Sequence, residues 1–202
     1  MKIYDFKLAP NPRRVRIYLA EKGLKVPLEE IDIMKGVNRQ EQFLRINPLG
    51  GIPVLELDDG RYLAESVAIC RYFEELHPEP ALFGKGAFER ATIEMWNRRM
   101  EFALFVPIGM VWMHLHELTR ARVKQIPEVG EQQKKVVEMR YRWLDEEFGQ
   151  RQFIAGDKFS VADITAMVAI DFAKFNNISI EPQFKHLQRW HQAVSSRPSA
   201  AA

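Results

Sequence analysis

The stretch from Asn47 to Ser66, NPLGGIPVLELDDGRYLAES, constrains the fold of this chain more than any other segment. Residues 54–57 suit a short, half-buried strand, and Asp59-Gly60 is a strong signal for a tight turn into a second strand. Ile52 to Leu63 is therefore predicted to form a β-hairpin.

Both ends of this hairpin offer backbone groups to a ligand. Before it, Gly50-Gly51 leaves the backbone unhindered, and Ile52-Pro53 enters the strand where the missing N–H of proline is tolerated. An extended ligand could pair there. After it, Glu65-Ser66 opens an apolar-periodic helix whose first-turn N–H groups form an anion site. The pattern predicts a carboxylate against Ser66.

These residues resemble the glutathione-binding half of the cytosolic glutathione transferases, of a bacterial type. In that family the proline is cis, the preceding residue pairs through its backbone with the cysteinyl part of glutathione, and a Glu-Ser pair holds the γ-glutamyl end. The resemblance implies these roles for Pro53, Ile52, Glu65 and Ser66. The family's polar pair before the proline motif is Gly50-Gly51 here, so further help for the carboxylates is expected from Arg13, Arg39 or Gln42.

Composition narrows the class of protein. The 202 residues can bury a sizeable core in one domain or two, and 29 basic against 27 acidic residues are too balanced for a nucleic-acid partner. No apolar run approaches the roughly 20 residues of a membrane span, and the N-terminus lacks a signal-peptide pattern, so we expect a cytoplasmic protein. Cys70, the single cysteine, is predicted to be a buried core residue. A reactive thiol would have to come from a ligand.

The first part of the chain predicts a thioredoxin-like βαβαββα domain over residues 1–79. Proline at position 27 indicates that the second strand lies at a sheet edge or begins late. The elements before the hairpin are a strand at 2–6, a helix from an Asn11 N-cap to Gly23 with Pro12 at its first position, a strand within 24–33, and a short helix at 42–46.

Residues 80–86 are predicted to be a linker, and residues 87–202 an all-helical domain. Pro107 lies inside a long helical pattern, which predicts a kink near 103–107. Ser160 and Asp163 have the spacing of a capping box and also resemble the box of the transferase helical domain, so we expect a structural role for them. The other helical patterns are 87–116, 131–148 and 183–194.

The catalytic position departs from the family pattern. Family members stabilise the glutathione thiolate with a tyrosine, serine or cysteine near the end of the first strand, because the free thiol has a pKa of about 8.5. Counting back from Arg14-Val15, which the family shares, that position is Ala9, which cannot donate a hydrogen bond. The candidate substitutes are the Asn11 amide, the first-turn N–H groups of Arg13 and Arg14, Tyr4, and a water oriented by His114.

His114 lies where, in this family, the corresponding helix faces the glutathione sulfur. A neutral imidazole could orient a water there, and the alternative is a partly exposed histidine at a helix end. His114 and His116 are two residues apart on a helix, so they do not form a metal-binding pair.

The resemblance implies a transferase that joins the glutathione thiolate to a hydrophobic electrophile, with glutathione as co-substrate, no metal, a homodimeric assembly and a role in detoxification. An alternative is a non-catalytic protein of this fold that binds apolar ligands or a protein partner. The residues expected to line the electrophile pocket, which could equally be bundle core or a subunit interface, are Leu8, Phe105, Val106, Gly109, Met110 and Met113.

Overall fold

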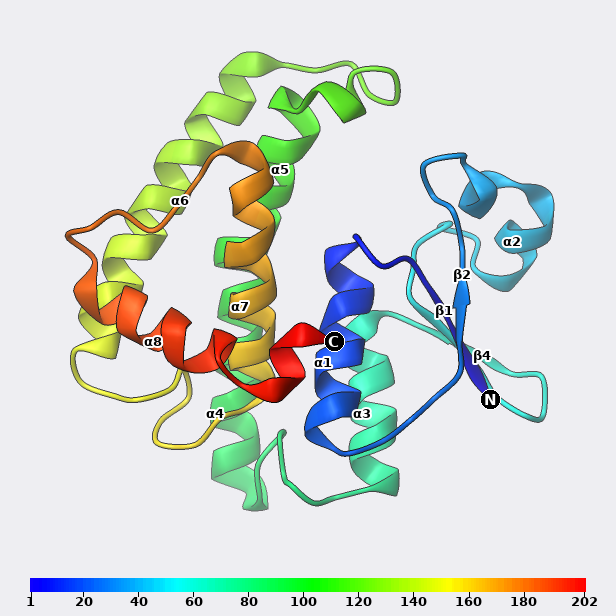
Figure 1. Cartoon of the computed structure of the whole chain (residues 1–202), viewed down its shortest axis with the longest axis horizontal. Coiled ribbons are helices and arrows are strands. Elements are labelled where there is room, and N and C mark those ends of the chain that lie inside the picture. Colours follow the sequence, from blue (N-terminus) through cyan, green and yellow to red (C-terminus); the bar gives the residue numbers. More distant parts are fainter. The chain divides into compact units, whose positions relative to one another are not determined.

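The computed structural model describes residues 1–202 and divides into two compact units. Met1–Ala81 and Pro198–Ala202 form the first unit, and Leu82–Arg197 form the second. The element labels used below are those of Figure 1. None of the helices combines the length and the apolar character that crossing a membrane would require.

The first unit contains a four-stranded sheet in the order β2-β1-β3-β4. β2 runs parallel to β1, and the other neighbours are antiparallel. Since β2 is at the edge, the expectation from Pro27 is confirmed. The strands are β1 (Lys2–Asp5), β2 (Leu28–Glu30), β3 (Val54–Glu56) and β4 (Tyr62–Ala64), and the last two form the predicted hairpin.

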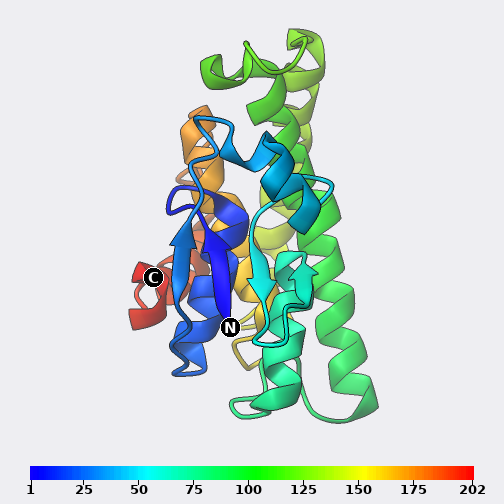
Figure 2. The ribbon, with the colours of Figure 1, turned by 90° about the vertical axis from the view of Figure 1, so that its right-hand side faces the viewer.

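Helices cover both faces of this sheet, which confirms the βαβαββα order. α1 (Pro10–Glu21) and α3 (Ser66–Leu76) lie on one face, and α2 (Glu41–Ile46) lies on the other after a 3-10 turn at Val37–Arg39 (Figures 1 and 2). Tyr4 and Val54 pack with Phe43 of α2 in one buried cluster. Successive strand residues point to opposite faces, so Tyr4 points away from α1.

A buried polar group joins α1 to α3 near their ends. Glu74 accepts hydrogen bonds from the Tyr18 hydroxyl and pairs with the Lys22 ammonium, each at 2.5 Å. Lys22 also donates to the carbonyls of His77 and Pro80, beyond the last turn of α3. The Lys22 ammonium group therefore bonds to carbonyls just after α3 as well as to its buried carboxylate partner. A buried charge requires such partners.

The five C-terminal residues, which the sequence assigns to the helical domain, pack in the first unit. The Ser199 hydroxyl is hydrogen-bonded to Glu21 on α1, and Arg13 Nη2 donates to the Ala200 carbonyl at 3.2 Å. Ser199 is buried by this packing.

The second unit is built from helices. α7 is buried along most of its length and forms the centre of the unit. The helices are α4 (Gly86–Arg99), the π-helical turn η2 (Met100–Phe105), α5 (Val106–Leu115), the 3-10 turn η3 (Glu117–Thr119), α6 (Pro127–Phe148), α7 (Val161–Ala173), the 3-10 turn η4 (Lys174–Asn176) and α8 (Lys185–Ser195).

The helical rod from α4 to α5 is irregular where the sequence predicts a kink. Pro107 has no N–H to donate to the preceding turn, and the π-helical turn η2 lies directly before it. A widened turn of this kind is one way in which a helix accommodates a local break.

The predicted capping box at the start of α7 is confirmed. The Asp163 carboxylate accepts the Ser160 N–H at 3.0 Å, and it also accepts the Ile154 N–H and the Trp190 indole N–H, each at 2.9 Å. Burial raises the pKa of Asp163 to about 6, although these donors favour the ionised form. This carboxylate is fully committed to structure.

Candidate functional site

Strand register brings the two ends of the hairpin motif together. Val54 pairs with Ala64, and continuing the antiparallel register places Ile52-Pro53 opposite Glu65-Ser66. The Ile52-Pro53 peptide bond is cis, as the resemblance implies. Ile52 lies beyond the last pair of the β3–β4 ladder, so its N–H and C=O are not used by the sheet.

Side chains from the α2 region hold the loop before this proline. Asn38 Nδ2 donates to the Gly50 carbonyl at 2.7 Å, Arg39 Nη1 to the Leu49 carbonyl at 3.0 Å, and Asn47 Nδ2 to the Gly51 carbonyl at 2.9 Å. The two glycines thus keep a defined backbone path without polar side chains of their own. No sequence pattern predicted the roles of Asn38 and Asn47.

The start of α3 combines backbone strain with unused donors. Glu65 has φ 70° and ψ 116°, a conformation rare outside glycine, and such outliers concentrate at functional sites. Its carbonyl accepts the Ile69 N–H at 2.9 Å, which begins the helix. The amides of Ser66, Val67 and Ala68 have no partner within the helix, so they form an anion site next to Ile52-Pro53.

A buried arginine lies behind this anion site. Arg14 on α1 is only 1% exposed, and its Nη1 donates to Ser66 Oγ at 3.0 Å. Because the serine oxygen accepts from Arg14, its hydroxyl hydrogen is left to donate elsewhere. The sequence pattern predicted a role for the backbone N–H of Arg14 but none for its side chain, and the apolar neighbours of this arginine in a helical pattern were the available signal.

The start of α1 differs from the prediction. Ala9, not Asn11, is the N-cap residue, with extended backbone at φ −81° and ψ 135°, because Pro10 already supplies the first helical φ. The Arg13 N–H donates to the Ala9 carbonyl at 3.2 Å. Contrary to the prediction, it is therefore not an unused first-turn donor. Pro10 and Pro12 carry no N–H, which leaves the amide of exposed Asn11 as the first-turn donor.

Neither Tyr4 nor Cys70 is placed to take part in thiol chemistry. Tyr4 is buried on the α2 face, where its hydroxyl donates to Glu56 at 2.6 Å and burial raises its pKa to about 12. Cys70 is completely buried on α3, and burial raises its pKa to about 12 against the opposing charge of Arg14. The expectation that Cys70 is a core residue is confirmed.

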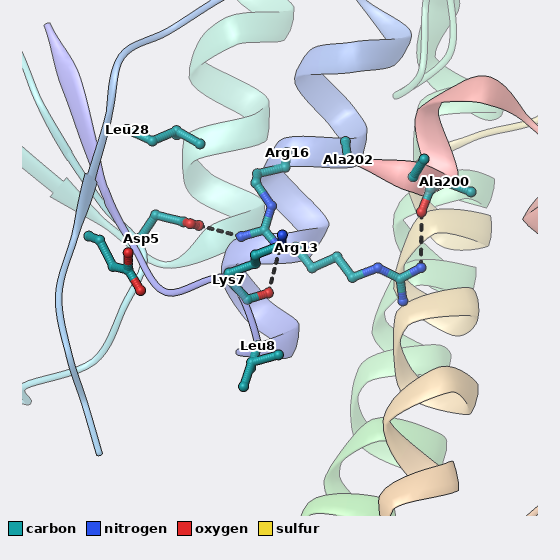
Figure 3. A pocket seen from close by; sticks show the side chains of 10 residues that line it. Asp5, Lys7, Leu8, Arg13, Arg16, Leu28, Ala200 and Ala202 are labelled. Atoms are coloured by element: carbon teal, nitrogen blue, oxygen red, sulfur yellow. Dashed lines mark hydrogen bonds and ion pairs between the residues drawn. The ribbon is translucent and has the colours of Figure 1, made fainter. Parts of the chain in front are cut away.

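Leu8 and Arg13 border a pocket of about 550 Å³ on the first unit (Figure 3). Arg16 pairs with Asp5 at 2.5 Å inside it, and Arg13 reaches the C-terminal segment at Ala200. The Ile52-Pro53 and Glu65-Ser66 segments do not line this pocket. The Arg13 side chain therefore bonds to Ala200 and does not extend to the start of α3, where the carboxylate of a ligand is predicted.

Known proteins resemble both units. Residues 9–76 match the family model for the glutathione S-transferase N-terminal domain, and residues 104–198 match that for the C-terminal domain. Glutathione S-transferase 2 of Saccharomyces cerevisiae is 36% identical over 203 residues, covering 98% of this chain and 87% of that protein. The chain belongs to the glutathione S-transferase family.

Solved structures of this family superpose closely on the chain. A glutathione S-transferase domain-containing protein of Marinobacter aquaeolei is 40% identical with a TM-score of 0.93, covering 98% of this chain and 99% of that one. Gtt2 of Saccharomyces cerevisiae is 35% identical with a TM-score of 0.94, covering 100% and 99%.

In this glutathione S-transferase, α5 presents an apolar face. Val106, Met110 and Met113 are spaced four and three residues apart, so they share one side of the helix, and Val106 and Met113 are 50% and 40% exposed. Phe102, 62% exposed, lies four residues before Val106 and was not among the predicted pocket residues. Phe105 was also predicted to line the pocket, but it is buried. Its ring packs against that of Phe172, with ring centroids 6.3 Å apart, which places it in the core of the helical unit.

His114 is buried near the end of α5 and already has one structural partner. Its Nδ1 accepts the Ile126 N–H at 3.1 Å, immediately before α6. A neutral histidine that accepts at Nδ1 carries its proton at Nε2, so the side chain retains one donor. His116 uses its own Nδ1 to accept the Leu118 N–H and stacks on Trp112.

Proposed function

We propose that this glutathione transferase joins the thiolate of glutathione to a hydrophobic electrophile. The observation that carries the proposal is that the Ile52 backbone lies next to the start of α3. There the buried Arg14 side chain donates a hydrogen bond to the Ser66 hydroxyl. An extended peptide ending in a free amino acid carboxylate is complementary to such a site.

Each part of glutathione has a partner in this proposal. The γ-glutamyl carboxylate accepts from the Ser66 hydroxyl and the first α3 amides, while Glu65 receives the ammonium group. The cysteinyl backbone pairs with Ile52 next to Pro53. The glycine carboxylate lies near Arg39 and Gln42, both exposed beside the loop that Asn38 and Asn47 hold.

Thiolate stabilisation is assigned to Asn11 and His114 in place of the usual hydroxyl. Asn11 offers a backbone N–H at the positive end of α1 and an exposed side-chain amide that is not used as a cap. His114 offers its Nε2–H to a water that donates to the sulfur. Cys70 is buried and cannot supply a competing thiol.

The electrophile binds against apolar side chains that are exposed or partly exposed in their own units. These are Leu8 on the loop after β1, and Val106, Met110 and Met113 on α5. Methionine adapts to ligands of different shape, which suits a broad range of hydrophobic electrophiles. A homodimer in the cytoplasm with a detoxifying role completes the proposal. Light scattering during size exclusion tests the dimer.

An absorbance titration of bound glutathione near the 240 nm thiolate band tests the chemistry. We expect a thiol pKa lowered by about one to two pH units, or about 1.4 to 2.7 kcal/mol of preferential thiolate stabilisation. Clear binding with an unchanged thiol pKa would favour the second candidate, a non-catalytic glutathione-binding protein, which the methyl group of Ala9 at the usual catalytic position favours. A failure to bind glutathione would reject both.

A further inference from the structure

Two side chains tie the connection between α5 and α6 back to the last turn of α5. Gln125 Nε2 donates to the His116 carbonyl at 2.8 Å and to the Thr119 hydroxyl oxygen at 2.9 Å. The Thr119 hydroxyl lies 2.7 Å from the same carbonyl, and 3.1 and 3.0 Å from the carbonyls of Trp112 and Met113. The last carbonyls of a helix have no partner within it, so these side chains supply donors to them. We call Thr119 and Gln125 the clamp residues.

The residue after Gln125 reaches a different part of α5. The Ile126 N–H donates to His114 Nδ1 at 3.1 Å. Ile126 precedes Pro127 and has an extended backbone, at φ −123° and ψ 91°, which is the conformation that proline favours in the residue before it. Since Gln125 and Ile126 are consecutive, the bonds that Gln125 makes to α5 restrict where the Ile126 N–H points.

The start of α6 also packs tightly against the end of α5. Gly130 is buried near the start of α6, and a Cβ there would overlap Cγ of Leu115. Leu115 directly follows His114, so the missing side chain of Gly130 is what lets α6 approach α5 at this point. This close approach keeps Ile126 next to the histidine.

The bond from Ile126 fixes the state of a buried side chain. His114 is 9% exposed, and a neutral histidine carries its one proton on either ring nitrogen. An N–H that is donated to Nδ1 requires a lone pair there, so the proton is on Nε2. Without this bond the ring could turn about its side-chain torsions and present a different atom in place of the Nε2–H.

We propose that Thr119 and Gln125 are positioning residues of the transferase reaction and act through His114. By holding the Ile126 N–H against Nδ1, the clamp residues keep the Nε2–H directed at the water that donates to the glutathione sulfur. Their role rests on the proposed function, in which His114 stabilises the thiolate through that water. The clamp residues, His114 and Ile126 all belong to the helical unit.

NMR of the isotope-labelled, full-length protein detects the bond directly, because an N–H···N hydrogen bond transmits a spin coupling between its two nitrogens. We expect a coupling between the Ile126 amide nitrogen and His114 Nδ1. Gln125→Met and Thr119→Val each remove one clamp group while nearly preserving side-chain volume. Each should abolish the coupling.

Two further variants serve as controls. Thr119→Ser keeps the hydroxyl group, so it should keep the coupling and the rate of the unsubstituted protein. Lys124→Met is the matched control for Gln125→Met, because Lys124 is exposed and directly precedes Gln125 in the chain. It should also leave both measurements unchanged.

Steady-state kinetics then measures the effect on the reaction. Gln125→Met and Thr119→Val should each lower kcat about threefold to tenfold, the change expected when one hydrogen bond to a catalytic side chain is lost. The KM for glutathione should stay within about twofold, since the residues proposed to hold glutathione belong to the other unit. The thiol pKa of bound glutathione should rise in both variants, which a smaller fraction of folded protein would not cause.

Three results would overturn the proposal. The first is a coupling that is missing in the unsubstituted protein, or that survives in both Gln125→Met and Thr119→Val. The second is an unchanged kcat in both of these variants while His114→Asn lowers it, which would leave the proposed function standing. The third is an unchanged kcat in His114→Asn as well, which would reject the role of His114 and that of the clamp residues with it.

Discussion

Arg14 donates a hydrogen bond to Ser66 at 3.0 Å, although the two residues are 52 positions apart in the chain. The contact joins the second turn of α1 to the first turn of α3, near the residues that are proposed to hold the glutathione carboxylate and thiolate. A guanidinium that is 1% exposed exerts its charge through a medium of low polarity, where electrostatic attraction is strong.

Ser66→Ala should raise the KM for glutathione about tenfold to a hundredfold with a smaller change in kcat. The variant loses a charge-assisted hydrogen bond worth about 1.5 to 3 kcal/mol and leaves Arg14 one acceptor short. Steady-state kinetics with varied glutathione measures the effect. Ser196→Ala removes an exposed hydroxyl of the other unit and serves as the control; equal KM values in both variants would contradict the assignment.

Gly50 and Gly51 should differ sharply in their tolerance of alanine. Gly50 has φ 62°, and a Cβ there would lie 2.7 Å from the Asn38 carbonyl oxygen, whereas one at Gly51 would meet only Asn47 at 3.5 Å. Gly50→Ala should therefore lower the free energy of unfolding by about 1 to 3 kcal/mol and weaken glutathione binding. Gly51→Ala should change stability by less than about 0.5 kcal/mol. Urea unfolding of both variants decides the matter.

His114→Asn and His114→Gln separate the two nitrogens of this histidine. Asparagine can keep an acceptor for the Ile126 N–H near the position of Nδ1, while glutamine reaches toward Nε2 and loses that acceptor. If the proposed water is real, His114→Asn should fold normally but raise the pKa of bound glutathione and lower kcat about tenfold or more. An unchanged thiol pKa in His114→Asn would assign this side chain to structure alone.

Glu65→Gly should stabilise the protein and lower its affinity for glutathione. A non-glycine residue in this backbone conformation costs about 1 to 3 kcal/mol, and glycine adopts it with less strain, so we expect the free energy of unfolding to rise by about 1 kcal/mol. Glu65→Gln keeps the strain and removes only the charge. Thermal unfolding and glutathione calorimetry on the pair should show opposite trends for the glycine variant and a binding defect alone for the glutamine variant.

Asp163 should make stability fall as pH rises between about 4 and 6. Its pKa is raised from an unfolded value of about 3.9 to about 6, so in this window the native state binds more protons than the unfolded chain. Its contribution falls by about 3 kcal/mol across the window and is constant above it. Asp163→Asn does not titrate, so the difference in unfolding free energy between the two proteins should depend on pH. A constant difference would contradict the raised pKa.

Local patterns in the sequence predicted what local forces decide. The hairpin, the edge position of β2 and the capping box at Ser160 follow from turn chemistry, from Pro27 and from the three-residue spacing to Asp163. The start of α1 was misplaced because Asn11-Pro12 also has the form of a helix start, and Pro10 begins the helix two residues earlier than an asparagine cap would.

Contacts between distant segments could not be predicted in this way. The bond from Arg14 to Ser66 depends on the packing of two helices, and the hydrogen bond that His114 accepts depends on the path of the loop before α6. The sequence left open whether Tyr4 faces a ligand or the core, and in the structure its ring packs against Phe43, with ring centroids 5.7 Å apart. Such pairings arise from tertiary structure, which single-sequence patterns do not record.

The packing of Pro198–Ala202 in the first unit has a consequence for biosynthesis. The ribosome completes Met1–Ala81 early, but the residues that bond to Glu21 and Arg13 emerge only after the whole helical unit has been made. The thioredoxin-like unit therefore acquires this segment only after Leu82–Arg197 have been synthesised. Fragments cut at Ala81 would lack that segment, so the boundary for dissecting this protein is discontinuous in sequence.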